Sequence, residues 1–194
     1  MKNLSFIHIT KTGGTSIEDW GLKNDYKWGR HDNSMKKYNY HKFNDVSIWH
    51  IPAKYFDEEI YKDKVTFTCI RNPYTRIISE YYCYWSGSLK IFERDKDEFN
   101  SWIQNLLSQD NVVSALPQYL YQPVDNIIYF ENIQDDFRKL LLKYNIYNNP
   151  QLPHSNQSKY LGEKFTINDL YPETIKLINE KYKLDFKLFN YDMI

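Results

Sequence analysis

Residues 6–16 read FIHITKTGGTS, and the architecture predicted for the rest of the chain follows from them. Residues 4–9 are mostly apolar or β-prone, which is typical of a short buried strand. Gly13 and Gly14 interrupt that pattern, and an amphipathic run begins at Ile17. We therefore expect a strand, a tight glycine loop and the first turn of a helix, in that order.

This loop predicts a binding site for a phosphate group. Backbone N–H groups of a tight loop point at one spot, and the N-terminus of the following helix adds a partial positive charge there. Lys11 supplies a full positive charge, and Thr12, Thr15 and Ser16 supply hydroxyl groups. The alternative interpretation is a glycine turn between strand and helix that holds no ligand.

The order of residues differs from the phosphate loop of ordinary ATP- and GTP-binding proteins. That motif has a glycine, four residues and then Gly-Lys-Ser/Thr. Here Lys11 precedes the glycines. The order argues against a nucleotide kinase or NTPase, which remains an alternative function, as does a non-catalytic module that binds nucleotides or carbohydrates.

The composition predicts one domain that spans residues 1–194. A chain of 194 residues is long enough for one hydrophobic core and too short for two of comfortable size. The 25 Lys and Arg residues balance the 25 Asp and Glu residues, so no overall charge favours nucleic acid or an acidic membrane. No signal peptide or membrane-spanning segment is predicted, and we therefore expect a soluble, cytoplasmic protein.

Two further features bear on the environment and the ligand. Cys69 and Cys83 both fall in apolar runs, which predicts buried free thiols and a reducing compartment. Aromatic residues make up 18% of the chain, enough to line a groove that stacks on rings or sugars. Residues 23–45 mix basic and aromatic residues without a period, which is typical either of a functional loop or of a solvated surface excursion.

Strands and helices alternate along the chain. We predict further strands over residues 46–50, 65–70 and 126–130 and helices over residues 53–61, 73–86, 99–107, 132–144 (capped by Asn132) and 172–182, with apolar anchors in the tail at 185–191. This alternation predicts an α/β fold with a central, mostly parallel sheet and helices on both faces. Ligands of such sheets bind at the carboxyl ends of the strands, where the loops after Ile9 and Ile70 lie.

The loop after Ile70 predicts a second anion site. Arg71 comes directly after the strand, and Ser79 lies eight positions further on, inside the next helix. A guanidinium group meets a phosphate with a planar fork of donors, and a serine two helical turns away can face the same pocket. The alternative interpretation is a surface or salt-bridge arginine and a serine that only fills the helix.

Together the two loops resemble those of sulfotransferases that use 3′-phosphoadenosine 5′-phosphosulfate (PAPS). KTGGTS resembles their 5′-phosphosulfate loop, and the spacing of Arg71 and Ser79 resembles their 3′-phosphate motif. Later segments are similar to carbohydrate sulfotransferases, namely YFENIQDDFRKLL (129–141), LPHSNQSKY (152–160) and DFKLFNY (185–191). The chain is thus similar to the Golgi-type, family 2 carbohydrate sulfotransferases, without their membrane anchor.

This resemblance covers most of the chain, although residues 23–45 and 87–125 match poorly. It implies the sulfotransferase fold with a P-loop-like nucleotide site, PAPS as the sulfuryl donor and 3′,5′-ADP as the product. It also implies a small-molecule or oligosaccharide acceptor that offers a hydroxyl group. The reaction needs no metal, and the sequence has no metal-ligand spacing.

In-line transfer of SO₃ requires a group that stabilises the leaving oxygen and a base that removes the acceptor's proton. We expect Lys11 to act on the leaving charge, while the backbone amides of Thr12, Gly13, Gly14, Thr15 and Ser16 hold the 5′-phosphate. His50 is our candidate base, because it ends a predicted strand and related enzymes place a histidine base between their two phosphate loops. Alternatively, His50 packs beside Trp49 as an ordinary satisfied histidine.

Other residues are weaker candidates. Glu18, Asp19, His31 and His41 are alternatives for the base, although an acid in the first turn of a helix is common for structural reasons. Glu18, His31, Trp49 and Gln118 are candidates for binding the acceptor, and Gln118 lies in a stretch that resembles the family's acceptor region. Ser158 and Lys159, in the late loop, are expected to contact the nucleotide. His154 touches the nucleotide or caps that loop, and His8 is expected to be structural.

Overall fold

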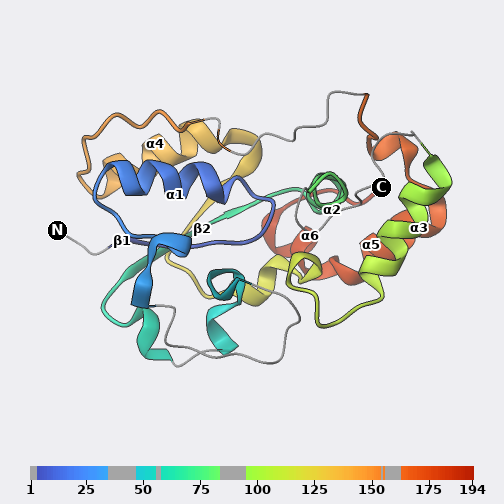
Figure 1. Ribbon diagram of the computed structural model, residues 1–194, viewed down its shortest axis with the longest axis horizontal. Coiled ribbons are helices and arrows are strands. Elements are labelled where there is room, and N and C mark those ends of the chain that lie inside the picture. The colour runs from blue at the N-terminus through green and yellow to red at the C-terminus, as the bar shows by residue number, and fades with distance from the viewer. Residues whose placement is uncertain (1–3, 35–46, 56–57, 84–94, 154, 156–162) are drawn as a thin grey trace.

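A computed structural model describes residues 4–34, 47–55, 58–83, 95–153, 155 and 163–194 (Figure 1). The strands are β1 (Leu4–Ile7), β2 (Val65–Ile70) and β3 (Asn126–Tyr129). The α-helices are α1 (Gly14–Lys23), α2 (Pro73–Tyr81), α3 (Lys96–Leu107), α4 (Ile133–Lys143), α5 (Pro172–Lys181) and α6 (Lys183–Phe189). Short 3₁₀ helices cover Gly29–His31, Ile48–His50, Ala53–Tyr55, Glu58–Tyr61, Val113–Ala115, Gln118–Tyr121, Phe130–Asn132 and Ile167–Asp169.

The three strands form one parallel sheet in the order β1-β2-β3. Leu4 is in register with Val65, and Phe67 with Asn126. All three strands therefore run in the same direction and end at the same edge. A parallel sheet with helices between its strands is an α/β fold, as the sequence predicts.

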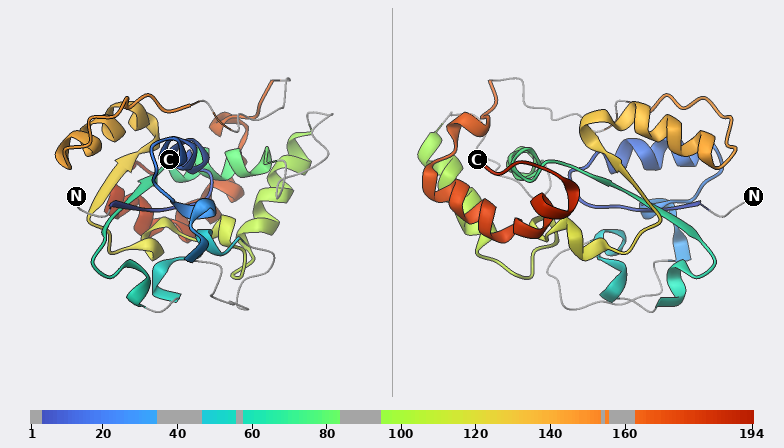
Figure 2. Two further views of the ribbon diagram at one scale, coloured as in Figure 1. Left: turned by 60° about the vertical axis from the view of Figure 1, so that its left-hand side comes forward. Right: turned by 180° about the vertical axis from the view of Figure 1, so that it is seen from behind.

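Helices α1 and α4 lie side by side over one face of the sheet (Figures 1 and 2). They pack there because Phe6, Phe67 and Ile128 share that face and Ile17 and Phe137 come down from the two helices to meet them. All five side chains are almost fully buried. Burial of this apolar surface stabilises the sheet by about 25 cal/mol for each Å² removed from water.

The opposite face is covered mainly by other segments. Ile7 and Ile70 pack against Tyr121, from a 3₁₀ helix, and against Phe189, at the end of α6. The tail therefore anchors the domain through apolar residues, as predicted, and Phe186 is buried as well. The prediction of helices on both faces holds, and this face is covered by α6 and by 3₁₀ turns.

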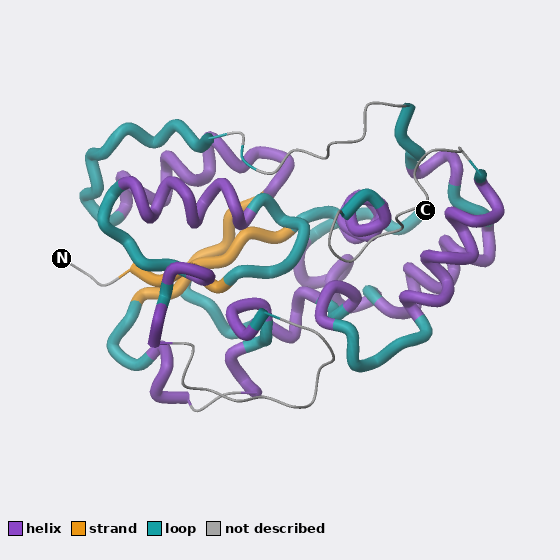
Figure 3. Tube along the Cα trace, in the orientation of Figure 1, coloured by secondary structure: helices purple, strands orange, loops and turns teal. Residues whose placement is uncertain are grey.

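A second apolar cluster joins helices α2, α3, α5 and α6 beyond the end of the sheet. Tyr81, Phe99 and Tyr182 lie at its centre and are almost inaccessible to solvent. Figure 3 shows the strands directed toward this group of helices. The loops that follow β1 and β2 thus lie between the sheet and the helical cluster.

Four local predictions were wrong or incomplete. Residues 48–50 form a 3₁₀ helix where a strand was predicted, and residues 53–61 give two short 3₁₀ helices where one α-helix was expected. Helix α6 follows α5 after a break at Tyr182 and was not predicted as a helix. Asn132 does not cap α4 with its side chain, which instead donates to Asp136.

Smaller differences concern boundaries and burial. Strand β1 ends at Ile7, and α2 ends at Tyr81. Helix α3 starts at Lys96 because the carboxylate of Asp95 accepts from two backbone N–H groups of its first turn. Both cysteines are free thiols, but only Cys69 is fully buried and Cys83 is half-buried. None of the helices in the described part of the chain is long and apolar enough to cross a membrane.

Candidate functional site

The loop after β1 needs its two glycines for different reasons. Gly13 precedes α1 with a φ of 82°, a left-handed conformation that residues with a side chain adopt only under strain. Gly14 needs no such φ, but a Cβ atom there would lie 2.1 Å from Nε2 of His8. Lys11 itself has a φ of 62°. The loop is therefore a constrained turn that ends at the N-terminus of α1, as an anion site requires.

The hydroxyl groups of this loop have different roles. The hydroxyl of Thr12 is buried and donates to the carbonyl of Ile9 at 2.8 Å, so it shapes the loop and does not reach a ligand. Oγ of Ser16 accepts from the backbone N–H of Ser155 at 3.3 Å. This bond brings the late segment of the chain onto the start of α1. Thr15 is half-buried.

The second loop touches the first through Arg71. Its Nη1 donates to the carbonyl of Lys11 at 3.2 Å, and its Nε donates to the hydroxyl of Thr75 at 3.0 Å. The guanidinium carbon lies 4.1 Å from the centre of the Phe130 ring. Burial lowers the pKa of Arg71 to about 10, against the opposing effect of Glu131, so the group stays charged at neutral pH.

These two cations form no close ion pair among the described residues, although the charge of Glu131 acts on Arg71 from further away. Neither Lys11 nor Arg71 forms an ion pair with any carboxylate in that part of the chain, although their loops are in contact. Two loops in contact that each carry a positive side chain favour an anion near them. The predicted pair of anion-binding loops is thus brought together at one edge of the sheet.

Gln118 supports the backbone of Arg71. Its Oε1 accepts from the N–H of Arg71 at 2.9 Å, and its Nε2 donates to the carbonyl of the same residue at 2.8 Å. The side chain is fully buried. Because both ends of the amide are used and no part of it is exposed, Gln118 does not offer the acceptor contact that was expected, and it fixes the second loop instead.

Arg71 and Ser79 line the same hollow, which has a volume of about 520 Å³. Its other walls are Thr75, Ile78, Tyr82 and residues 164–168. The backbone N–H of Phe165 donates to the hydroxyl of Tyr82 at 2.6 Å, which fixes residues 164–168 against α2. Lys164 adds a further positive charge at this wall. The predicted Arg71 and Ser79 pair thus shares one pocket.

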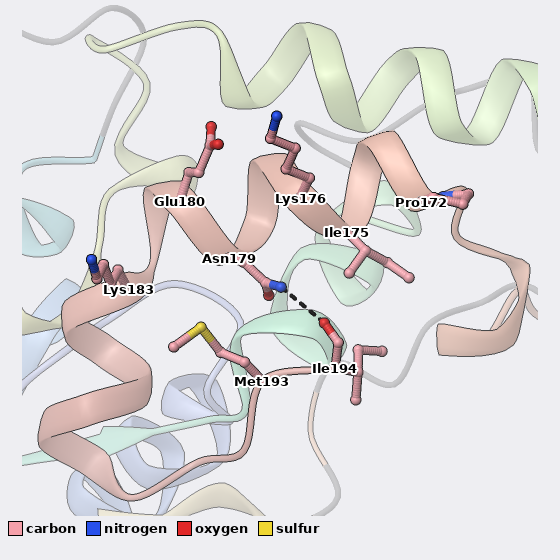
Figure 4. A pocket seen from close by; sticks show the side chains of 8 residues that line it. All are labelled: Pro172, Ile175, Lys176, Asn179, Glu180, Lys183, Met193 and Ile194. Atoms are coloured by element: carbon pink, nitrogen blue, oxygen red, sulfur yellow. Dashed lines mark hydrogen bonds between the residues drawn. The ribbon is translucent and has the colours of Figure 1, made fainter.

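Another hollow, of about 390 Å³, lies between α5 and the end of the chain (Figure 4). Figure 4 shows Asn179 bonded to the backbone oxygen of Ile194, at 2.9 Å, on one side of it. It is lined by Pro172, Ile175, Lys176, Asn179, Glu180, Lys183, Met193 and Ile194. Since neither phosphate loop contributes to it, we do not place the site there.

His50 lies beside the first loop, although it ends a 3₁₀ helix and not a strand. Its Nδ1 lies 3.3 Å from the carbonyl of His8, and the hydroxyl of Tyr121 donates to the carbonyl of His50 at 2.6 Å. Burial, and then the nearby charges of His8 and Lys11, hold the pKa of His50 well below its usual value. A neutral ring that donates from Nδ1 keeps a lone pair on Nε2 with which to accept a proton.

The other candidate bases are engaged inside the protein. Glu18 is buried and lies 2.7 Å from Nδ1 of His8, so it neither reaches an acceptor nor acts as a base on one. Asp19 pairs with the guanidinium group of Arg30, whose Nε also donates to Nε2 of His31 at 3.1 Å. Because Glu18 and Asp19 have these internal partners, His50 remains our candidate for the base.

Two further predicted residues flank this region, and four lie outside the described residues. His31 is half-buried and stays within 3.9 Å of Asp19. Trp49 is half-buried, with its ring centre 5.8 Å from that of His50. The positions outside the described residues are His41, His154, Ser158 and Lys159.

Among the residues that the structure describes, no group of His, Cys, Asp and Glu is arranged to hold a metal ion.

Sequence reasoning missed the contribution of the third strand. Phe130 and Glu131 follow β3, and they meet Arg71 and the backbone N–H of Asn72 respectively. The rule that ligands bind at the carboxyl ends of parallel strands applies to β3 as well as to β1 and β2. Applied to the predicted strand at 126–130, this rule would have indicated Phe130 and Glu131 as site residues. No sequence pattern indicated that residues 164–168 would line the hollow beside Arg71 and Ser79.

Comparison with known proteins adds one match. The model of the family described as "Sulfotransferase family" matches residues 1–192. No curated protein and no solved structure shows significant similarity to the chain. The match contains both loops, His50 and the C-terminal helices.

Proposed function

The chain belongs to the sulfotransferase family, and on that basis we propose that it transfers a sulfuryl group from PAPS to a hydroxyl group of a carbohydrate. The observation that supports this proposal most is the contact between Arg71 and the carbonyl of Lys11. It brings two loops with unpaired positive charge side by side, as a nucleotide with phosphates at its 3′ and 5′ positions requires.

The residues present fit such a nucleotide. The glycine turn leads into the N-terminus of α1, which favours an anion, and Arg71 presents a charged fork that stacks on the ring of Phe130. The hollow between Arg71, Ser79 and residues 164–168 has room for part of the nucleoside. PAPS, when bound, would supply a sulfuryl group on a good leaving phosphate.

The residues of the chain would then stabilise the negative charge of the donor and remove the proton of the acceptor hydroxyl. The amides of the loop before Ser16 hold the 5′-phosphate, since the N–H of Ser16 itself donates to the carbonyl of Gly13 at 3.0 Å. The ammonium group of Lys11 stabilises the negative charge that develops on the leaving oxygen. His50 takes the proton of the acceptor hydroxyl at Nε2, while its Nδ1–H stays on the carbonyl of His8. Among the described residues, we assign Trp49 and His31 to binding of the acceptor. We also propose that residues 1–194 form one domain.

Transfer of labelled sulfate from PAPS to a panel of glycans and phenols tests this function. We expect transfer to at least one glycan without added metal. Tight binding of 3′,5′-ADP with no transfer to any acceptor would indicate a binding module. Binding of ATP with Mg²⁺ in preference to 3′,5′-ADP would indicate a kinase or NTPase and would overturn the proposal.

A further inference from the structure

His8 and Glu18 form a buried pair directly beneath the first loop. Nδ1 of His8 lies 2.7 Å from Oε1 of Glu18, and the two residues are 5% and 1% exposed. The backbone N–H of Arg30 also donates to Oε1 of Glu18, at 3.1 Å. Charged or titratable groups are rarely buried this deeply without a specific role in structure or function.

Two glycines leave the space that this pair occupies. A Cβ atom on Gly14 would lie 2.1 Å from Nε2 of His8, and one on Gly29 would lie 1.8 Å from Oε1 of Glu18. Neither side chain has room to move aside, because both are enclosed. The imidazole ring is therefore held against the backbone of the phosphate loop on one side and against a carboxylate on the other.

The same ring contacts the candidate base. The ring centres of His8 and His50 are 4.2 Å apart at an angle of 75°. His50 also uses the carbonyl of His8 as its hydrogen-bond acceptor. Residue 8 thus meets His50 through both its side chain and its backbone, while it supports Gly14 in the loop that would hold the sulfuryl donor.

We propose that His8, held by Glu18, is a positioning residue that keeps the base His50 and the phosphate loop in a fixed relation during transfer. This inference rests on the proposed function. His8 is not itself placed to touch the acceptor, since its ring is enclosed by Glu18, Gly14 and His50. Its effect on the reaction passes through His50.

The charges around the two rings indicate how the pair acts. His8 faces Glu18 of α1, behind which Nε of Arg30 lies 3.5 Å from the second carboxylate oxygen. His50 faces His8 and the charge of Lys11, and the hydroxyl of Tyr121 bonds its carbonyl. Burial, and then the nearby charge of His8, lower the pKa of His50, so the ring of His50 stays neutral and able to accept a proton.

The variant Glu18→Gln keeps the shape of the side chain and removes its charge. We expect kcat to fall about tenfold, less than the roughly 10²- to 10⁴-fold expected for loss of a base itself, with little change in KM for PAPS. In ¹⁵N NMR of the imidazole rings, the titration of His50 should move to higher pH, because the charge at His8 that lowers the pKa of His50 is no longer supported by the carboxylate of Glu18. Asp19→Asn is the matched control, since it also removes a carboxylate from Arg30 but does not touch His8, and it should leave the titration of His50 in place.

An unchanged titration of His50 in folded Glu18→Gln would overturn the inference, and so would an equal shift in Asp19→Asn. If Glu18→Gln does not fold, His8→Asn replaces it, because the asparagine amide can still donate to Glu18 while the ring is lost. The same shift of His50 and the same fall in kcat are then expected. The NMR measurement does not depend on turnover, so absence of sulfate transfer by the unaltered protein would contradict the proposed function and leave this inference to be judged on the titration.

Discussion

Arg71 connects the two loops of the candidate site through separate parts of the same residue. Its guanidinium group reaches the carbonyl of Lys11, while its backbone is held at both ends by the amide of Gln118. The ring of Phe130 restricts the plane of the guanidinium group. Because an arginine fork recognises a phosphate only in the correct orientation, these contacts prepare the side chain before a ligand arrives.

Lys11 has a different expected role, in turnover more than in affinity. We predict that Lys11→Ala lowers kcat about 10²-fold, because the ammonium group acts on charge that develops only during transfer. The dissociation constant of 3′,5′-ADP should rise much less. Single-turnover kinetics and calorimetry on the same preparation measure the two effects. Equal losses in rate and affinity would show that Lys11 only binds the ground state.

His50 should determine how the reaction depends on pH. Because burial and the neighbouring positive charges lower its pKa, we predict that kcat/KM stays constant down through the usual histidine range and falls only at more acidic pH. A pH profile of kcat/KM measures this. In His50→Ala, turnover should be lost while 3′,5′-ADP still binds. A variant with unaltered turnover would move the base to another group.

At the scale of elements, the second loop depends on a helix that is distant in sequence. Asp185, in α6, accepts from the backbone N–H groups of Gln118 and Tyr119, each at 2.8 Å. Burial raises the pKa of Asp185, and the positive charge of Arg76 opposes that effect. The chain of contacts thus runs from α6 through Gln118 to Arg71, which couples the C-terminal helices to the phosphate loop.

We predict that Asp185→Ala destabilises the protein by about 3 kcal/mol, since two buried N–H groups lose their acceptor. Urea unfolding followed by circular dichroism measures the change. Asp192→Ala, an exposed aspartate in the same tail, is the control and should change stability by less than about 0.5 kcal/mol. Similar values for both variants would show that Asp185 is not a structural anchor.

The sequence predicts the elements with a clear period and misses those that depend on tertiary packing. Strands at 65–70 and 126–129 and the helix from Pro73 have local signals, namely β-branched runs and a proline at the first turn. Residues 48–50 have the composition of a strand, but they join none of the described strands and form a 3₁₀ helix. Helix α6 was read only as an apolar tail, because a seven-residue segment carries too short a pattern.

The site was predicted from its loops, and its supporting contacts were not. Glycines after strands and an arginine with a serine eight positions later are local signals for anion binding. Gln118 was expected to face an acceptor, yet it holds the backbone of Arg71 from 47 positions away in the sequence. Glu18 likewise has the position of an ordinary helix acid, and only the fold brings it to His8.

At the scale of the whole molecule, the sheet supplies the loops and the helical cluster supplies the opposite wall. Lys11 and Arg71 follow strands β1 and β2, whereas Tyr82 and residues 164–168 belong to the helical part. A nucleotide in this position would contact both parts. Its phosphates would lie at the end of the sheet, and its nucleoside would extend toward the helices (Figure 1).

Calorimetric titration of the protein with 3′,5′-ADP and with 5′-AMP, without metal, tests the central claim most directly. We predict that 3′,5′-ADP binds at least about tenfold more tightly, because charge-assisted bonds to the second phosphate come from Arg71 and Ser79. This preference should disappear in Arg71→Ala, while the affinity for 5′-AMP stays the same. Equal affinity for the two nucleotides, or a preference that survives in Arg71→Ala, would contradict the claim that both loops hold one ligand.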